Sequence, residues 1–383
     1  MSVLLPWTRK KKKAQGRVAR AQRPATGRPR RPRRLGLLLL LAGLAFATLR
    51  FHEAFQDGTL PRPMSGGSKV WEVSAPRCVD GLYALAGEDE GSALYGPSGK
   101  IALLPEAPGQ AVISDGTVYV TDGTSLNAYG PDGALTATRP LEPGERLLAC
   151  SGLSGVLAFM PAGGAYGEQW MIRAVTASGT SAPRIPLPGV PSKAAKHGNL
   201  LYIGLRDIAS GGLARLACAR ADSGSLLWTL PLDHGHWRAI IPVRDGAILY
   251  ATSQSAGMVG PDGGVLAIFP VRGEIWAATW EGVCVALCHG SSSRAFLTLY
   301  SQDGQVIWQH RLPSPAHSLL FREGVIVALC QTHVIGFSLR DGRKESFFAT
   351  RDLPLAVGDG LVLFGKDSGA YLVRFDQSRT RIP

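Results

Sequence analysis

Long apolar segments are almost absent from this sequence. Among its 383 residues, only residues 35–49 form a long leucine-rich run. From residue 70 onward, no stretch keeps a helical apolar period for about 12 residues, because glycine and proline interrupt it. This absence excludes a helical bundle. The short runs that remain, such as Val118-Tyr-Val-Thr, often alternate, which predicts an all-β body.

Acidic residues are missing from the first 34 positions, which carry 13 lysines and arginines. The whole chain has a net charge of +12, so the other 349 residues together carry −1. The basic character therefore belongs to a short tail, residues 1–34. A basic folded body, with the nucleic-acid partner that it would imply, is not supported. The tail is expected to determine the membrane topology and to contact anionic lipid, and binding of nucleic acid in the cytoplasm is the alternative.

Residues 35–51 are predicted to be a single transmembrane signal-anchor. The uncharged core reaches roughly 22 Å as a helix, short of the ~20 residues that usually span a bilayer. Arg34 and Arg50 can extend their charges to the interface, and Phe51 prolongs the apolar run. A cleaved signal peptide, cut near Ala47, is the alternative. In both cases the tail stays cytoplasmic and the body is exported.

No cysteine stands at the end of the apolar run, so a bacterial lipoprotein anchor is excluded. Residues 52–69 contain glycine, proline and serine without an apolar period, and are predicted to be a linker. Residues 70–383 then form one domain.

That domain repeats one short pattern eight times: a small or polar residue and a glycine precede an apolar run. The intervals between these glycines range from 35 to 48 residues, with a mean near 40. A period of about 40 residues, with two strand–turn units per repeat, is typical of propeller blades. We therefore predict an eight-bladed β-propeller, with seven blades as the alternative. The predicted blade-turn glycines are Gly81, Gly116, Gly155, Gly198, Gly246, Gly282, Gly324 and Gly360.

A second turn recurs within most repeats and ends in Asp-Gly or Ser-Gly, and the Asp-Gly turns, for example Asp262-Gly263 and Asp341-Gly342, are strong hairpin signals. Full repeats continue past it into one more strand, but the last repeat ends too early. The missing strand is present before the first repeat, around Trp71. We predict that this strand completes the last blade and closes the ring.

The repeat ending at Trp228 reads Leu216-Ala-Cys-Ala-Arg-Ala-Asp-Ser-Gly224-Ser-Leu-Leu-Trp, and a shorter form ends at Trp308. This pattern resembles the PQQ-like (quinoprotein-type) β-propeller repeat. The resemblance implies that Trp71, Trp228 and Trp308 dock one blade onto the next. The other repeats lack the tryptophan.

The resemblance implies two functional branches. Quinoprotein dehydrogenases use PQQ with a calcium ion, are much longer, and many carry an adjacent Cys-Cys pair, which is absent here. The BamB-type branch is an exported, non-catalytic scaffold for assembling outer-membrane β-barrels. It is similar in blade number and length, but it is lipid-anchored.

The six cysteines, in an exported body, permit disulfides whose connectivity the sequence does not reveal. The alternative is that they are small buried residues. Cys288 and Cys330 occupy the same place in two adjacent repeats. Cys288-His289 and Cys330 with His333 could form a thiol–imidazole pair only if the side chains meet.

His234 and His236 are the weak metal candidates, since alternate residues of an extended chain point the same way. No third ligand is identifiable. We therefore expect no cofactor and no catalytic residue. We therefore predict a membrane-anchored extracytoplasmic scaffold that binds unknown protein partners through inter-blade loops such as 206–213 and 233–240. A cofactor-dependent oxidoreductase is the alternative, and an envelope sensor is a third possibility.

Overall fold

The computed structural model describes residues 62–64, 67–80, 82–88, 91–104, 110–114, 117–163, 169–176 and 183–375. The basic tail, the proposed anchor, most of the linker, Gly81 and Gly116 lie outside these residues. No helix within the described ranges has the length and apolar character needed to cross a membrane.

The described residues form an all-β propeller with eight four-stranded blades. Blade 1 comprises β3 (Pro76–Asp80), β4 (Tyr83–Glu88), β5 (Gly91–Gly96) and β6 (Gly99–Leu104); blade 2 comprises β7 (Gln110–Ser114), β8 (Thr117–Thr121), β9 (Ser125–Tyr129) and β10 (Leu135–Pro140). Blade 3 comprises β11 (Arg146–Ser151), β12 (Gly155–Gly163), β13 (Gln169–Thr176) and β14 (Ile185–Leu187); blade 4 comprises β15 (Val190–His197), β16 (Leu200–Asp207), β17 (Leu213–Arg220) and β18 (Leu226–Pro231).

The second half of the ring repeats the same order. Blade 5 comprises β19 (Trp237–Pro242), β20 (Ile248–Thr252), β21 (Ala256–Val259) and β22 (Val265–Ile268), with the short 3₁₀ turn η1 (Arg244–Gly246) inside it; blade 6 comprises β23 (Glu274–Glu281), β24 (Cys284–Ser291), β25 (Arg294–Ser301) and β26 (Val306–Leu312). Blade 7 comprises β27 (Ala316–Arg322), β28 (Val325–Cys330), β29 (His333–Ser338) and β30 (Lys344–Ala349); blade 8 comprises β31 (Leu353–Gly358), β32 (Leu361–Lys366), β33 (Gly369–Arg374) and β2 (Ser68–Ser74).

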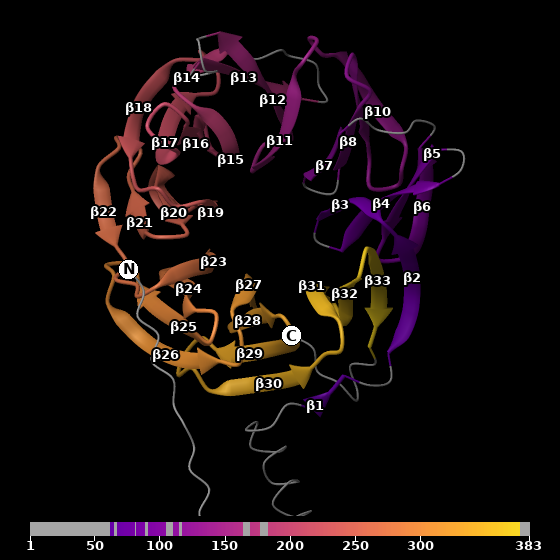
Figure 1. The fold of residues 1–383 in the computed structure, drawn as a ribbon, viewed down its shortest axis with the longest axis vertical. Helices are drawn as coiled ribbons and strands as arrows, with labels where there is room; N and C mark the ends of the chain where they lie inside the picture. The colour runs from indigo at the N-terminus through magenta and orange to yellow at the C-terminus, as the bar shows by residue number, and fades with distance from the viewer. Residues whose placement is uncertain are drawn as a thin grey trace, which may run out of the picture. The chain divides into compact units, whose positions relative to one another are not determined.

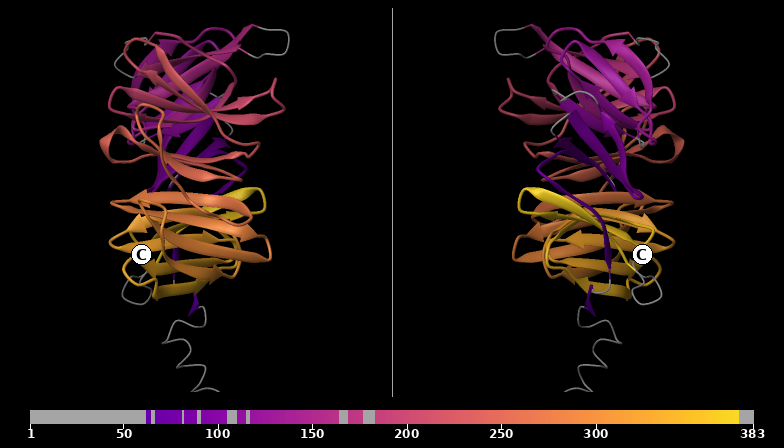
Figure 2. Two further views of the ribbon diagram at one scale, coloured as in Figure 1. Left: turned by 90° about the vertical axis from the view of Figure 1, so that its left-hand side faces the viewer. Right: turned by 90° about the vertical axis from the view of Figure 1, so that its right-hand side faces the viewer.

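The blades stand around a central axis. Figure 1 looks along this axis, and the first strand of each blade lies innermost. The side views in Figure 2 show the strands running roughly along the axis. Neighbouring strands within a blade are antiparallel. The innermost strands β11 and β15 also pair in parallel, through Cys150 with Ala194 and Ser151 with Ala195, which joins blades 3 and 4 into one sheet.

The chain closes its ring with its own N-terminal strand, as the sequence predicted. β2 pairs antiparallel with β33 and forms the outer strand of blade 8. A second N-terminal piece, β1 (Arg62–Pro63), pairs in parallel with β30 at the outer edge of blade 7. Strand addition at these two places covers edges that would otherwise expose unpaired backbone groups.

Apolar burial follows the same geometry. Among the described residues, eight core clusters each lie between two adjacent blades, so that every blade buries both of its faces. The cluster that contains Trp71 and Val73 joins blade 8 to Ala84 and Ala86 of blade 1. A single blade could not bury both faces alone, so the eight clusters are what makes the closed ring stable.

The outer strands share one irregularity. In seven of them a β-bulge shifts the pairing register by one residue. The residue that directly follows the bulge occupies the equivalent position in each of these blades. The residues at that position are Trp71, Ala102, Ala137, Trp228, Ala267, Trp308 and Ser346.

Each tryptophan at this position donates its indole N–H to the next blade. Trp71 bonds the Gly96 carbonyl at 2.7 Å, Trp228 the Pro261 carbonyl at 2.8 Å and Trp308 the Leu339 carbonyl at 3.3 Å. All three acceptors lie in or next to the turn between the third and fourth strands of the next blade.

The hairpin glycine of that turn makes room for the ring. A Cβ at Gly342 would lie 2.9 Å from the Trp308 ring, and one at Gly263 would lie 3.0 Å from Trp228. Both glycines also have positive φ, 69° and 87°. Any other residue there would be strained by its backbone as well as by contact.

The described blade-turn glycines lie between the first and second strands. Gly155 differs from the others: it begins β12 in an extended conformation, and a Cβ there would meet the Val175 carbonyl oxygen at 2.4 Å. The remaining five have positive φ: Gly198 (58°), Gly246 (76°), Gly282 (62°), Gly324 (80°) and Gly360 (74°).

Candidate functional site: the axial cavity and the loops of blades 4 and 5

The innermost strands carry a second set of β-bulges, near their first residues. The strands concerned are β3, β15, β19, β23, β27 and β31. The innermost strands of blades 2 and 3 pair without a shift. The innermost strands all run in the same direction along the propeller axis. Their first residues, and therefore these bulges, lie at the same end of this axis. Bulges of this kind re-aim side chains at the rims of barrels.

Two of these bulge residues brace one blade against the next. Arg238 donates from Nε to the Ile275 carbonyl oxygen at 3.0 Å and from Nη2 to Glu274 at 2.7 Å. His317 bonds the backbone of Pro354 in the same way, from blade 7 to blade 8. In each case the residue whose backbone carbonyl accepts the bond, Ile275 or Pro354, lies immediately before the bulge in the innermost strand of the following blade.

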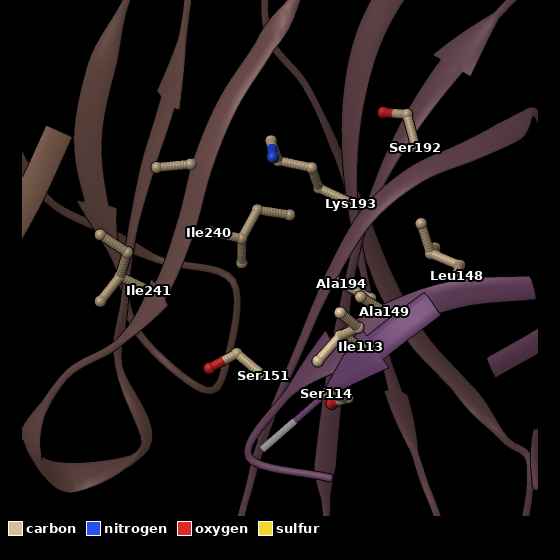
Figure 3. Close-up of a pocket in the computed structure, with 11 residues that line it drawn as sticks. Ile113, Ser114, Leu148, Ala149, Ser151, Ser192, Lys193, Ala194, Ile240 and Ile241 are labelled. Carbon is tan, nitrogen blue, oxygen red and sulfur yellow. The ribbon is translucent and has the colours of Figure 1, made fainter. Parts of the chain in front are cut away.

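A cavity of about 520 Å³ lies beside the axis, between the innermost strands of blades 2 to 5. Figure 3 shows its walls, contributed by β7, β11, β15 and β19. Seven of its eleven lining residues are apolar: Ile113, Leu148, Ala149, Ala194, Ala239, Ile240 and Ile241. The other four are Ser114, Ser151, Ser192 and Lys193.

Lys193 is the one charged residue among those that line this cavity. In Figure 3 its side chain extends from β15 toward Ile240 of β19. Desolvation by the surrounding walls, and second the Arg238 guanidinium, lower the pKa of the Lys193 ammonium. The side chain is nevertheless open to water in the cavity. No carboxylate of the described residues forms an ion pair with it.

The position of Lys193 is unusual among the blades. It is the residue directly after the inner bulge, and the equivalent residues in the other bulged strands are Cys78, Ala239, Ala277, Ser318 and Ala356. Sequence reasoning missed Lys193. Aligning the repeats on their inner strands would have shown one lysine where the others have small residues.

Blade 5 packs against β16, the strand that pairs with β15 at Lys193. Gly204 lies opposite Lys193 in the register, and a Cβ at Gly204 would be 2.7 Å from the Trp237 ring. Trp237 of blade 5 donates its indole N–H to the Leu205 carbonyl at 2.9 Å. Blade 5 therefore packs directly against the strand that supports Lys193.

The segment that contains His234 and His236 connects blades 4 and 5. Asp233 accepts hydrogen bonds from Gly235 N at 2.6 Å and from the hydroxyls of Thr252 and Ser255. The structure leaves both histidine side chains exposed on this braced loop. Within the described part of the chain, no three His, Cys, Asp or Glu residues are grouped so that they could hold a metal ion.

The segment 206–213 joins β16 to β17, so the expectation that it is an inter-blade loop is wrong: it lies within blade 4. It is fixed by Asp207, which accepts bonds from Ser210 and from Arg215 Nε at 2.8 Å. Burial alone would raise the pKa of Asp207, but these bonds outweigh it and lower the pKa. The loop presents Ile208, whose relative exposure is 49%.

The two loops are neighbours on one face of the ring. Ala214, at the start of β17, donates to the Asp233 carbonyl at 2.6 Å, and Leu232 N donates back to the Ala214 carbonyl at 2.9 Å. We call the exposed residues Ile208, His234 and His236 the loop platform.

Five cysteines, Cys150, Cys218, Cys284, Cys288 and Cys330, are free thiols, and all of these except Cys284 are buried. Burial raises the pKa of Cys288 and of Cys330 to about 12. Cys288 Sγ accepts the Ala316 N–H, while the His289 ring bonds Thr298 and the Arg272 carbonyl. Successive strand residues face opposite sides, so this thiol and imidazole do not meet.

Comparison with known proteins reveals the fold and no family. Neither a family model nor a curated protein matches the sequence. Among solved structures, Sqt1 of Saccharomyces cerevisiae is similar with a TM-score of 0.60 and 12% identity, over 82% of this chain and 99% of that chain. BamB from Moraxella catarrhalis is similar with a TM-score of 0.51 and 14% identity, over 81% of this chain and 98% of that chain.

A europium-containing methanol dehydrogenase is similar with a TM-score of 0.54 and 10% identity, over 80% of this chain and 84% of that chain. At such identities the likeness shows a shared propeller fold, on which unrelated functions occur.

Proposed function

We propose that this protein is a membrane-anchored, extracytoplasmic scaffold whose propeller binds partner proteins without catalysis. The observation that carries the proposal is the loop platform. Two adjacent loops expose an isoleucine and two imidazoles, while buried or half-buried aspartates fix the backbone beneath them. Loops held by a rigid scaffold bind with little loss of conformational entropy, so they suit protein recognition.

The anchored part of the proposal is supported by the sequence of residues 1–51. A reporter active only outside the cytoplasm, fused after Pro383, should be active in cells. The mature protein should keep its N-terminus and should sediment with membranes. An N-terminus beginning near Ala47 would replace anchoring with secretion, and a cytoplasmic C-terminal reporter would refute export.

The binding role can be tested by crosslinking in cells. A photoreactive amino acid at Ile208 or His234 of the full-length protein should capture a specific partner. The control places the same amino acid at Arg343, in the turn between β29 and β30 at the other end of the strands. Asp233→Ala, which releases the loop, should reduce capture at His234. Equal capture from both faces, or none at either, would refute a platform on this face.

A cofactor-dependent oxidoreductase is the second candidate, and the fold likeness to a methanol dehydrogenase favours it. We assign no residue of this chain to PQQ or to calcium. Adding PQQ and Ca²⁺ to the purified protein should produce no saturable spectral change if the scaffold proposal is right. Saturable binding accompanied by dye reduction with an alcohol would favour the enzyme.

A further inference from the structure

We propose that the axial cavity is a binding site for an amphipathic monocarboxylate, an apolar molecule with one carboxylate group that Lys193 binds. This inference does not rest on the loop platform, because the cavity lies among the innermost strands of blades 2 to 5.

The walls select an apolar body. Seven of the eleven lining residues are alanine, leucine or isoleucine, and they come from four different strands. Covering such walls with an apolar molecule removes hydrocarbon from water on both sides. A cavity of about 520 Å³ also lies within the size range of small-molecule sites.

The charge selects a monoanion. The lining contains one ammonium and no carboxylate. Arg238, the other nearby cation, already binds Glu274 and the Ile275 carbonyl. One ammonium can neutralise one carboxylate, whereas a phosphate dianion or a polyanion would keep uncompensated charge against apolar walls. The three serine hydroxyls supply neutral donors.

The placement of Lys193 is not required by the fold. Five other blades build the same bulge with alanine, serine or cysteine at this position, so the architecture needs only a small residue there. A lysine there brings a cation beside Arg238, and the pKa of its ammonium is lowered. A bound carboxylate would offset the electrostatic repulsion between the Lys193 ammonium and the Arg238 guanidinium. The carboxylate of the ligand should therefore lie at the Lys193 end of the cavity.

The test uses the full-length protein in lipid nanodiscs, with empty nanodiscs as the blank. The probes are 4-phenylbutyrate and its uncharged match, 4-phenylbutanamide, titrated by calorimetry. Wild-type protein should bind the acid more tightly than the amide. Lys193→Met should weaken acid binding by about tenfold or more and leave amide binding unchanged. Lys193→Arg, which keeps the charge, should retain most of the affinity for the acid.

The matched control is Lys196→Met, on the same strand but outside the cavity lining. It should bind the acid like wild type. Ala149→Phe fills the cavity and should weaken both probes together. Equal acid affinity in wild type and Lys193→Met, or no saturable binding of the acid to wild type, would overturn the proposal.

A carboxylate attached to an apolar group could belong to a free acid or to the C-terminus of a peptide. Acetyl-Leu-Phe with a free carboxylate, compared with its C-terminal amide, distinguishes them. Carboxylate-dependent binding of the dipeptide that Lys193→Met abolishes would identify a peptide terminus. Binding of 4-phenylbutyrate alone would identify a free acid.

Discussion

Two junctions between blades solve the same packing problem in different ways. Between blades 6 and 7, Trp308 bonds the Leu339 carbonyl and its ring lies 6.0 Å from Phe337. Between blades 5 and 6, the equivalent residue is Ala267. Blade 6 there holds the connecting loop instead: Tyr300 donates its hydroxyl to the Pro270 carbonyl at 2.7 Å, and the His289 ring bonds the Arg272 carbonyl.

The difference shows that the docking tryptophan is one of two local solutions. With it, the outer strand is attached to the hairpin of the next blade. Where the tryptophan is absent, the rings of Tyr300 and Phe269 pack with their centroids 5.4 Å apart. The hydrogen bonds of Tyr300 and His289 then attach the loop that connects the two blades. The tryptophan depends on apolar burial, whereas the second solution depends on buried polar groups, so the two junctions should respond differently to mutation and pH.

The largest effect should come from Trp71→Ala, at the junction that closes the ring. Trp71 is only 6% exposed and also bonds the Gly96 carbonyl. Its loss should lower the free energy of unfolding by about 3–5 kcal/mol. Denaturant titration monitored by circular dichroism measures this. A change below about 1 kcal/mol would show that β2 closes the ring without its tryptophan.

Trp308→Ala should cost less, about 2–3 kcal/mol, because Trp308 is partly exposed. Trp308→Phe should recover part of the loss, since it keeps the ring and lacks the N–H. If Trp308→Phe were as damaging as Trp308→Ala, the hydrogen bond to Leu339 would outweigh the packing.

The reverse substitution sharpens the comparison. Ala267→Trp places an indole where Tyr300 and Phe269 already fill the junction. We expect destabilisation by about 1–3 kcal/mol from overpacking, rather than a gain. A stabilised variant in thermal unfolding would show that the junction between blades 5 and 6 has room for a tryptophan.

Tyr300→Phe removes only the hydroxyl that bonds Pro270. The carbonyl then loses its donor, and the free energy of unfolding should fall by about 1 kcal/mol. The equivalent residue at the tryptophan-docked junction is Phe337, which has no hydroxyl, so this loss is specific to the junction between blades 5 and 6. An effect near zero for Tyr300→Phe would mean that water replaces the lost donor.

The smallest effect is the pH dependence of His289. Burial lowers the pKa of this imidazole, so the folded state favours its neutral form. Above the ordinary histidine pKa of about 6.5, this contribution to stability is fully present. As pH falls below that value, the unfolded state binds the proton more readily and stability decreases until the lowered folded pKa is passed.

His289→Gln keeps hydrogen-bonding capacity and removes the titration, so the loss of stability between pH 7.5 and pH 5 should be smaller than in wild type. His310, His317 and His333 also have lowered pKa values, and a partial effect is therefore expected. An unchanged pH profile would assign the dependence to the other histidines.

The closing strand could be predicted because its signal is local. A repeat that ends early and an extra Trp71 strand at the other end leave few ways to complete a blade. The hairpins at Gly263 and Gly342 were equally readable, since Asp-Gly at the end of a short apolar run is a strong turn signal. The inter-blade assignment of 206–213 failed because a longer turn within a blade and a connection between blades have the same polar composition.

The sequence by itself determined the period, the all-β class, the turns and the closing strand, because these depend on spacing and on the conformational preferences of single residues. Only the tertiary structure decided where the inner bulges fall, that Lys193 faces an apolar cavity, and that Tyr300 and His289 replace a tryptophan. Those features depend on the register between strands and on contacts between blades that lie about 40 or more residues apart. The order of residue types along the chain does not specify which side chains of adjacent blades come into contact.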